Sequence, residues 1–147
     1  MLKVCVTFLF FIITFNLSAQ DKRYTHNAEN GFMWQGFEKR MIAKDMKYDF
    51  LSAMLDNQKL KRLSGNFNNN LGCELEIEKL QNENQNKIDL HFMVKMIDNF
   101  YSEIENLIIP INFAYCYCIK KLAGYKSEEL ESFRLKLINF SKATLKQ

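Results

Sequence analysis

A single proline and five glycines stand among the 147 residues, so few positions interrupt a helix. Apolar residues recur three, four and seven positions apart, the spacing that places side chains on one face of an α-helix. These stretches cover about 33–62, with a break near Gly36, then 89–102, 110–124 and 127 to near the end. The sequence therefore predicts an all-α fold, an antiparallel bundle of about four helices.

Residues typical of helix ends stand at the expected boundaries. Pro110 suits a first helical turn, where its missing N–H costs nothing. Gly124 is placed to end the same helix in a left-handed conformation. Ser127 is a suitable N-cap, with Glu128 and Glu129 in the positive first turn. The 110–124 helix is apolar on nearly all sides, which predicts a central position in the fold.

The region from 57 to 87 has a weaker pattern, and we expect it to be weakly ordered. Residues 64–72 are rich in Gly and Asn, which predicts a loop. Residues 73–78 alternate apolar and acidic side chains, as a half-buried strand does, although the glutamates also permit a helix. The expected fold thus includes one short irregular or β-like segment near 73–78.

Residues 1–19 have the organisation of a secretory signal peptide, with Lys3 before an apolar run and a small residue at Ala19. The apolar run is about 12 residues long, whereas a helix that spans a bilayer needs about 20. A lipid anchor would require a cysteine where Gln20 stands. We therefore expect cleavage near Ala19, a periplasmic or secreted product, and no stable membrane anchor.

Removal of residues 1–19 leaves 128 of the 147 residues, which suits one domain. We expect a flexible polar leader at 20–29 and a single helical domain at 30–147. Only Lys3 is lost from the 20 basic residues, so 19 face 17 acidic ones. This balance is not typical of nucleic-acid binding.

A pattern of single residues and pairs runs through the chain: Asn30-Gly31, Trp34, Lys47, Phe100-Tyr101, Glu105, Asn106, Ile109-Pro110, Ala114 and Gly124. In this pattern the chain resembles a family of small exported bacterial helical proteins of unknown function. Ala53 and Asn57 depart from the pattern, because glycines are usual there. A fainter likeness is to the amidase-immunity proteins of type VI secretion systems, which are exported, helical and disulfide-linked. The resemblance implies an exported helical protein and brings no established activity.

Three cysteines remain after the expected cleavage. A disulfide from Cys73 to Cys118 or to Cys116 would close a loop of about 44 residues and stabilise the fold by about 4 kcal/mol. Cys116 and Cys118 point in nearly opposite directions on a helix, so they do not suit a redox pair or a metal site. Cys118 lies on the inward face, and a buried free thiol is an equal alternative.

Candidate binding residues gather at the turn before the 110–124 helix. Tyr101, Glu105 and Asn106 lie there, and Trp34 is a candidate contact anchor. Three of them have a structural alternative: Glu105 as a solvated acid, Asn106 as a brace of the turn, and Trp34 as a core residue. We predict no metal site, because neither His26 nor His91 has a second ligand at metal spacing. We also predict no cofactor and no catalytic residues, since the chain has no Gly-x-Ser-x-Gly motif.

Two functions remain open from the sequence. The first is a non-catalytic inhibitor or immunity protein that binds a protein partner in the cell envelope through the helical face around the Asn-rich loop, without a deep polar pocket. The second is a periplasmic enzyme or small-ligand-binding protein with a concave pocket near Tyr101, Glu105 and Asn106. The partner, the oligomeric state and the disulfide pairing stay open.

Overall fold

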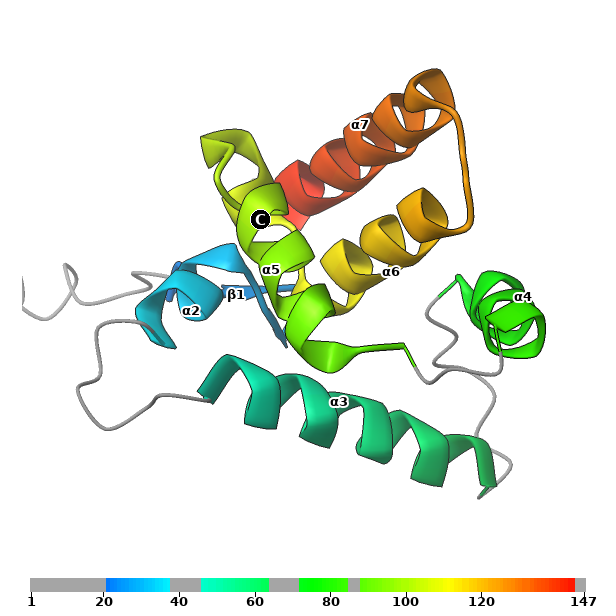
Figure 1. The fold of residues 1–147 in the computed structure, drawn as a ribbon. Helices are drawn as coiled ribbons and strands as arrows, with labels where there is room; N and C mark the ends of the chain where they lie inside the picture. The colour runs from blue at the N-terminus through cyan, green and yellow to red at the C-terminus, as the bar shows by residue number, and fades with distance from the viewer. Residues whose placement is uncertain (1–20, 38–45, 64–71, 85–87, 145–147) are drawn as a thin grey trace, which may run out of the picture.

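The structure is a computed structural model that describes residues 21–37, 46–63, 72–84 and 88–144. The predicted signal peptide and nearly all of the Asn-rich loop lie outside the described residues. Helices dominate the described chain, which confirms the predicted fold class (Figure 1). The elements in chain order are β1 (Tyr24–Thr25), β2 (Ala28–Glu29), α2 (Gly31–Gly36), α3 (Met46–Leu63), α4 (Glu74–Asn84), α5 (Leu90–Phe100), the 3-10 helix η3 (Ile104–Ile108), α6 (Ile111–Leu122) and α7 (Ser127–Thr144).

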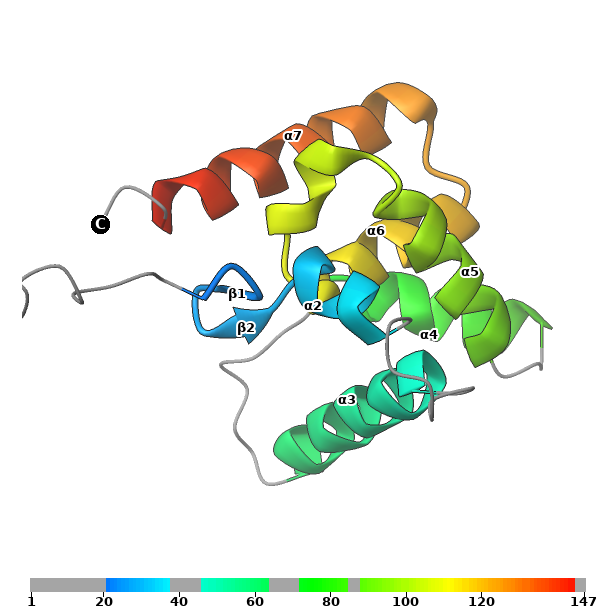
Figure 2. The ribbon, with the colours of Figure 1, turned by 90° about the vertical axis from the view of Figure 1, so that its left-hand side faces the viewer.

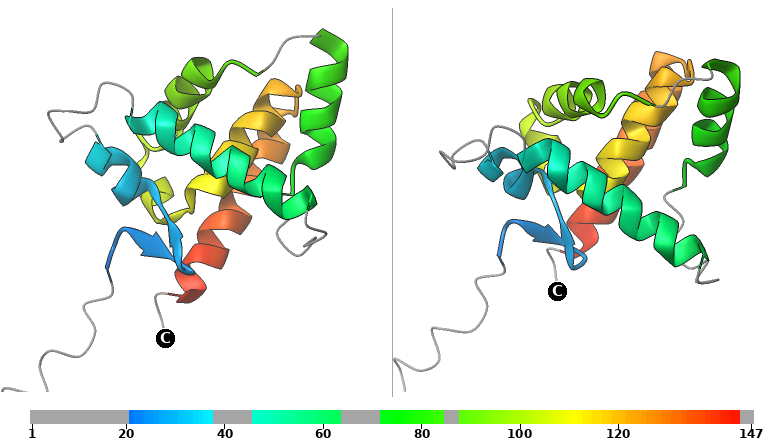
Figure 3. Two further views of the ribbon diagram at one scale, coloured as in Figure 1. Left: turned by 90° about the horizontal axis from the view of Figure 1, so that it is seen from below. Right: turned by 60° about the horizontal axis from the view of Figure 1, so that its bottom comes forward.

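Helix α6 lies at the centre of the packing, as its apolar surface predicts. It contacts α5, α7 and α4, while α3 packs against α5 and η3 packs against both α2 and α7. Helices α6 and α7 form an antiparallel hairpin (Figures 1 and 2), and α3 crosses this pair in both views of Figure 3. The core joins residues from all of these layers. Its largest fully buried apolar members are Trp34, Tyr101, Leu51, Met93, Ile97, Ile109, Ile111 and Ile119.

The predicted helix ends of α6 and α7 are close to those observed. Gly124 follows α6 with a φ of 84°, and the Tyr125 N–H donates to the Lys120 carbonyl at 3.2 Å. This is the left-handed ending that the glycine predicts. Pro110 stands directly before α6. Helix α7 begins at Ser127, and Lys126 before it donates its backbone N–H to Glu129 Oε2 at 2.9 Å.

Residues 24–29 form a two-stranded antiparallel hairpin, where the sequence predicted a flexible leader. His26 and Asn27 have φ values of 50° and 60°, the left-handed backbone that a two-residue type I′ turn requires. Asn30 Nδ2 donates to the Lys22 carbonyl at 2.8 Å and to Thr25 Oγ1 at 2.9 Å, and Thr25 is buried. Polar contacts hold this segment, so apolar periodicity gave no sign of it.

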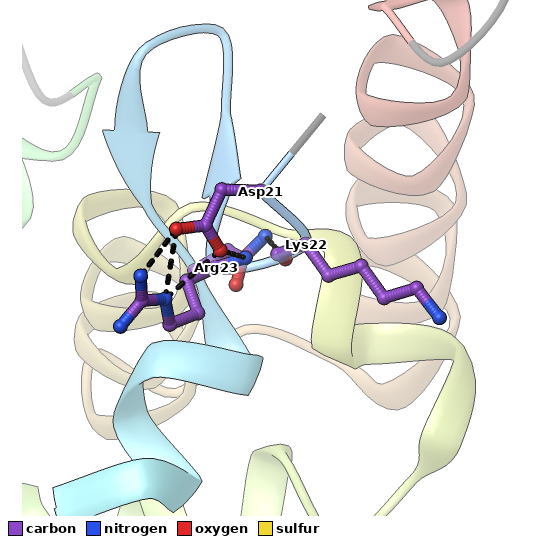
Figure 4. Close-up of polar contacts among 4 residues, drawn as sticks. Asp21, Lys22 and Arg23 are labelled. Carbon is purple, nitrogen blue, oxygen red and sulfur yellow. Dashed lines mark hydrogen bonds and ion pairs between the residues drawn. The ribbon is translucent and has the colours of Figure 1, made fainter. Parts of the chain in front are cut away.

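A second local contact orders the chain just before the hairpin. Arg23 Nε donates to both Asp21 oxygens, at 2.9 and 3.0 Å, and the Arg23 backbone N–H donates to Asp21 Oδ1 at 3.1 Å (Figure 4). The side-chain hydrogen bond from Arg23 lowers the pKa of Asp21 to about 2. Both side chains are exposed to solvent. Exposed ion pairs contribute little to stability, so we assign this pair a local role.

Residues 73–78 correct another expectation. The alternating segment belongs to helix α4, and α3 extends to Leu63, so helices occupy much of the region expected to be weakly ordered. Glu74 and Glu76 lie in the first turn of α4, where the helix dipole favours acidic side chains. The segment is thus helical, the alternative that the glutamates permitted, and the short β segment of the fold lies at 24–29 instead. Across the helices that the structure describes, none has the length and apolar character needed to cross a membrane.

Candidate functional site

The turn that links α5 to α6 is held rigid by side chains that bond to its own backbone. Asn106 Nδ2 donates to the Phe100 carbonyl at 2.7 Å, and Ser102 Oγ donates to the Asn99 carbonyl at 2.7 Å. The Tyr101 hydroxyl donates to the Ile109 carbonyl at 2.8 Å and so closes the turn from the inside. These bonds fix the backbone on both sides of η3.

The buried half of this turn contains two of the predicted binding residues. Tyr101 is 1 % exposed, and its ring lies against Gly31, where an added Cβ would come within 2.5 Å of Tyr101 Cδ1. Burial raises the pKa of the Tyr101 hydroxyl well above its usual value. Asn106 is 2 % exposed and braces the turn, as its structural alternative proposed. Tyr101 is therefore a core residue that positions the turn.

The outer half of the turn presents an apolar side chain to solvent. Ile104 is 81 % exposed, and Glu103 and Glu105 on either side of it are exposed as well. We call the segment 103–105 the ridge. The hydrogen bonds brace the backbone of the ridge, so its conformational entropy is already lost on folding. Binding through Ile104 therefore costs less entropy than binding through an isoleucine on a loose loop.

A cleft of about 430 Å³ opens beside the ridge, between α5, η3, α6 and α7. Buried or half-buried side chains from α5 and α6 contribute apolar surface to it, and charged side chains contribute the rest. The lining residues are Met96, Asn99, Phe100, Ser102, Glu103, Glu105, Asn106, Tyr117, Cys118, Lys121, Glu131 and Arg134. Of the predicted site residues, the cleft brings together Glu105 and Asn106.

Arg134 of α7 connects this cleft to the turn. Its guanidinium donates to Glu131 through Nε at 2.8 Å and Nη2 at 2.7 Å, and through Nη1 to Asn106 Oδ1 at 3.0 Å. Glu105 Oε2 lies 3.7 Å from Nη1. The hydrogen bonds with Glu131 raise the pKa of Arg134. The guanidinium is therefore largely neutralised by its own helix.

Cys118 contributes a thiol to the cleft rather than a nucleophile. Its side chain is 1 % exposed, and burial raises the pKa of the thiol to about 12. The proton therefore stays on sulfur at neutral pH, and a thiol is a weak nucleophile.

The disulfide joins Cys73 to Cys116, the second of the two pairings that the sequence left open. Cys118 is the free, buried cysteine among the described residues. The bond ties the start of α4 to the middle of α6. Close to it, Glu76 accepts hydrogen bonds from Lys120 Nζ at 2.5 Å and from the Tyr125 hydroxyl at 2.6 Å.

Trp34 is not an exposed contact anchor, because its side chain is fully buried. Its indole Nε1 donates to Asp98 Oδ1 at 2.7 Å, and Lys47 Nζ donates to the same oxygen at 2.5 Å. Lys47 also lies 5.5 Å from the centre of the indole ring. The three residues join α2, α3 and α5, so the cluster is structural.

The two histidines lie on separate ring stacks. His26 stacks on Phe140 at 4.2 Å between ring centres, and His91 stacks on Tyr48 at 4.5 Å. Within the described ranges, no group of three or more His, Cys, Asp or Glu side chains is placed to hold a metal ion.

Sequence reasoning missed the residues that α6 and α7 bring to the cleft. These are Tyr117, Lys121, Glu131 and Arg134. Two signals pointed to Arg134: it is the only arginine after Arg62, and Glu131 precedes it by three positions on a helix. Neither signal shows that α7 folds back onto η3, which is what places the guanidinium against Asn106.

Compared with known protein families, curated proteins and solved structures, the chain shows no match.

Proposed function

We propose that this chain is an exported, non-catalytic protein-interaction module of the inhibitor or immunity type, with the ridge as its contact surface. The observation that carries the proposal is the 81 % exposure of Ile104 on a turn that is braced from within. The sequence expectation centred the contact on the Asn-rich loop, nearly all of which lies outside the described residues.

Preorganisation supports a binding role for the ridge. A segment that is ordered before binding loses little conformational entropy in the complex, so its apolar contact contributes more to affinity. Hydrogen bonds of Ser102 and Asn106 brace the backbone around the ridge, and Tyr101 anchors it to the core. The ridge can therefore enter a partner's pocket without rearrangement.

The chemistry of the neighbouring cleft supports binding over catalysis. The Cys118 thiol keeps its proton at neutral pH. The Arg134 guanidinium, a cation of the cleft, already donates hydrogen bonds to Glu131 and Asn106. A catalytic site usually contains a group whose pKa is moved toward neutrality, whereas burial moves the pKa of Cys118 away from it.

A small-ligand-binding protein is the second candidate function. The cleft of about 430 Å³ beside Glu105 and Asn106 favours it, because converging polar groups around a concave surface are what such a protein needs. The two candidates differ in which atoms make the contact: the outer ridge in the first and the interior of the cleft in the second.

The test of the first candidate uses a matched pair of exposed aliphatic residues. Ile104 is 81 % exposed on the ridge and Leu75 is 80 % exposed on α4. A photo-crosslinking amino acid is placed at either position, and the protein is expressed in its own cell envelope. We expect one discrete crosslinked protein from position 104 and none of that size from position 75.

The purified partner then gives the quantitative test. Ile104→Ser should weaken binding by about tenfold or more, as the loss of a central apolar contact does, while Leu75→Ser leaves binding unchanged. Equal effects of the two substitutions would contradict the proposal. Binding of a small molecule that is lost with Arg134→Gln but retained with Ile104→Ser would favour the second candidate.

A further inference from the structure

We infer that the cleft beside the ridge accepts a basic side chain, lysine or arginine, that the partner inserts next to the ridge. The inference rests on the proposed function, because it assigns the kind of partner that the same surface fits. It is carried by an apolar, aromatic base and a carboxylate rim within one cleft.

The base of the cleft suits an alkyl stem. Phe100 and Tyr117 lie with ring centres 4.8 Å apart and a tilt of 44°, and Met96 and Cys118 continue this surface. Phe100 and Cys118 are buried, and Met96 and Tyr117 are half-buried. The long methylene stems of lysine and arginine pack on such surfaces while their charged ends remain near water. Aromatic rings add an attraction for the cation itself.

The rim of the cleft suits the charged end. Glu103 and Glu105 are exposed at the mouth, and within the described chain Glu103 has no ion pair. Glu105 lies 3.7 Å from an Arg134 nitrogen, a distance longer than a hydrogen bond. Glu103 is therefore available for a partner's cation, whereas Glu105 is shared with Arg134 through an ion pair.

The positive groups of the cleft do not reverse this preference. Glu131 holds Arg134 through two hydrogen bonds, which leaves Lys121 as the remaining cation of the lining. An anionic ligand would have to compete with Glu131 for the guanidinium and pass Glu103 and Glu105 at the mouth. A cation would compete with Arg134 for Glu105, but it reaches Glu103 first at the exposed rim.

The cleft is large enough to hold one long side chain. Its volume of about 430 Å³ lies near the lower end of the range of about 300–1,000 Å³ that small-ligand sites occupy. The ridge borders this opening, so a partner surface that covers Ile104 also reaches the mouth of the cleft. The partner is thus expected to pair an apolar pocket with a neighbouring lysine or arginine.

The experiment titrates the mature, disulfide-bonded chain with four blocked amino acids and follows backbone amide resonances by NMR. The probes are the N-acetyl, N-methylamide forms of lysine, arginine, norleucine and glutamate. We expect the lysine and arginine probes to shift resonances around Tyr117 and Lys121 with millimolar affinity that weakens as salt is added. The norleucine probe has the stem without the charge, so its affinity should be at least about fivefold lower.

Substitutions assign the effect to the rim and the base. Glu103→Gln and Glu105→Gln should each weaken the lysine probe by about threefold, and Tyr117→Leu should weaken both basic probes. Glu128→Gln, an exposed glutamate in the first turn of α7, is the matched control and should change nothing. Binding of the glutamate probe, or equal binding of the norleucine and lysine probes, would overturn the inference.

The outcomes separate this inference from the proposed function. If Ile104→Ser disrupts the partner complex while no basic probe binds the cleft, the inference is wrong and the interaction role stands. If Ile104→Ser and Leu75→Ser behave alike, the interaction role of the ridge fails whatever the probes show.

Discussion

Gly31 lies so close to the turn that there is no room for a side-chain carbon. The Tyr101 ring and the Leu107 backbone fill the space where a Cβ would stand, and an added carbon would lie 2.5 Å from Tyr101 Cδ1 and 2.8 Å from Leu107 Cα. Backbone cannot move aside as the end of a flexible side chain can. The close approach of α2 to the turn therefore depends on a glycine at this position.

Gly31→Ala should lower the free energy of unfolding by about 1–3 kcal/mol, because overpacking forces the turn away from α2. Gly36→Ala is the control, since an added Cβ there meets nothing within 4 Å and alanine favours the helix. Urea unfolding followed by circular dichroism gives both values. Equal stability of the two variants would show that α2 and the turn do not pack as described.

Asn106 acts at the same scale through hydrogen bonds. Asn106→Ala removes the donor to the Phe100 carbonyl and the acceptor for Arg134, so we expect a loss of about 1–3 kcal/mol in the free energy of unfolding. Asn99→Ala, an exposed position on α5, is the control and should be close to neutral. The same urea titration measures both. A neutral Asn106→Ala would mean that the ridge does not need this brace.

At the scale of elements, the sequence predicted helices well and the smallest elements poorly. The later helices follow from apolar spacing and from Gly124 and Ser127, because those signals are local. The hairpin at 24–29 was missed, since strands of two residues have no period and its burial comes from polar contacts around Asn30. Segment 73–78 was ambiguous because its alternation has the period of a strand, whereas its glutamates also suit a helix.

The disulfide gives the prediction that belongs to this scale. Replacement of both Cys73 and Cys116 by Ser should lower the free energy of unfolding by about 4 kcal/mol, the chain-entropy value for a loop of this length. Urea unfolding with and without a dithiol reductant measures the effect. Reductant should destabilise the parent protein by a similar amount and leave the double variant unchanged. An unchanged free energy of unfolding of the parent protein after full reduction of the bond would contradict this role.

At the scale of the whole molecule, the candidate site depended on contacts that no local pattern reveals. Glu105 and Asn106 both line the cleft, and they lie close together because both follow α5 directly in the sequence. Trp34 and Tyr101 proved to be buried, which their aromatic character allowed but did not decide. Arg134 was missed because it reaches Asn106 across 28 positions, through the return of α7 onto η3.

The pH dependence of stability is also a property of the whole fold. Burial raises the pKa of Glu76, but hydrogen bonds from Lys120 and Tyr125 lower it by more, so the folded pKa lies below the usual 4.5. A carboxylate with a lowered folded pKa stabilises the protein above the unfolded pKa, and that stabilisation is lost as the pH falls through the folded pKa.

Glu76→Gln should therefore be less stable than the parent at pH 7, by up to about 1 kcal/mol, and the difference should shrink below pH of about 4.5. Glu78→Gln is the control, because that glutamate is exposed on the same helix and should show no comparable difference. Urea unfolding at intervals from pH 7 to well below the usual pKa of 4.5 tests both. A difference that grows as the pH falls would contradict the assignment.

His26 stacks on Phe140, and its Nε2 donates a 3.0 Å hydrogen bond to the Phe140 carbonyl. This contact bears on whether the chain can be circularly permuted. The contact joins the β1–β2 hairpin to the last turns of α7, and both views of Figure 3 show these two elements side by side. The first and last elements of the described chain are thus in contact. A circular permutant that joins these ends with a short linker and opens at the exposed residues 124–126 should keep the same neighbours throughout.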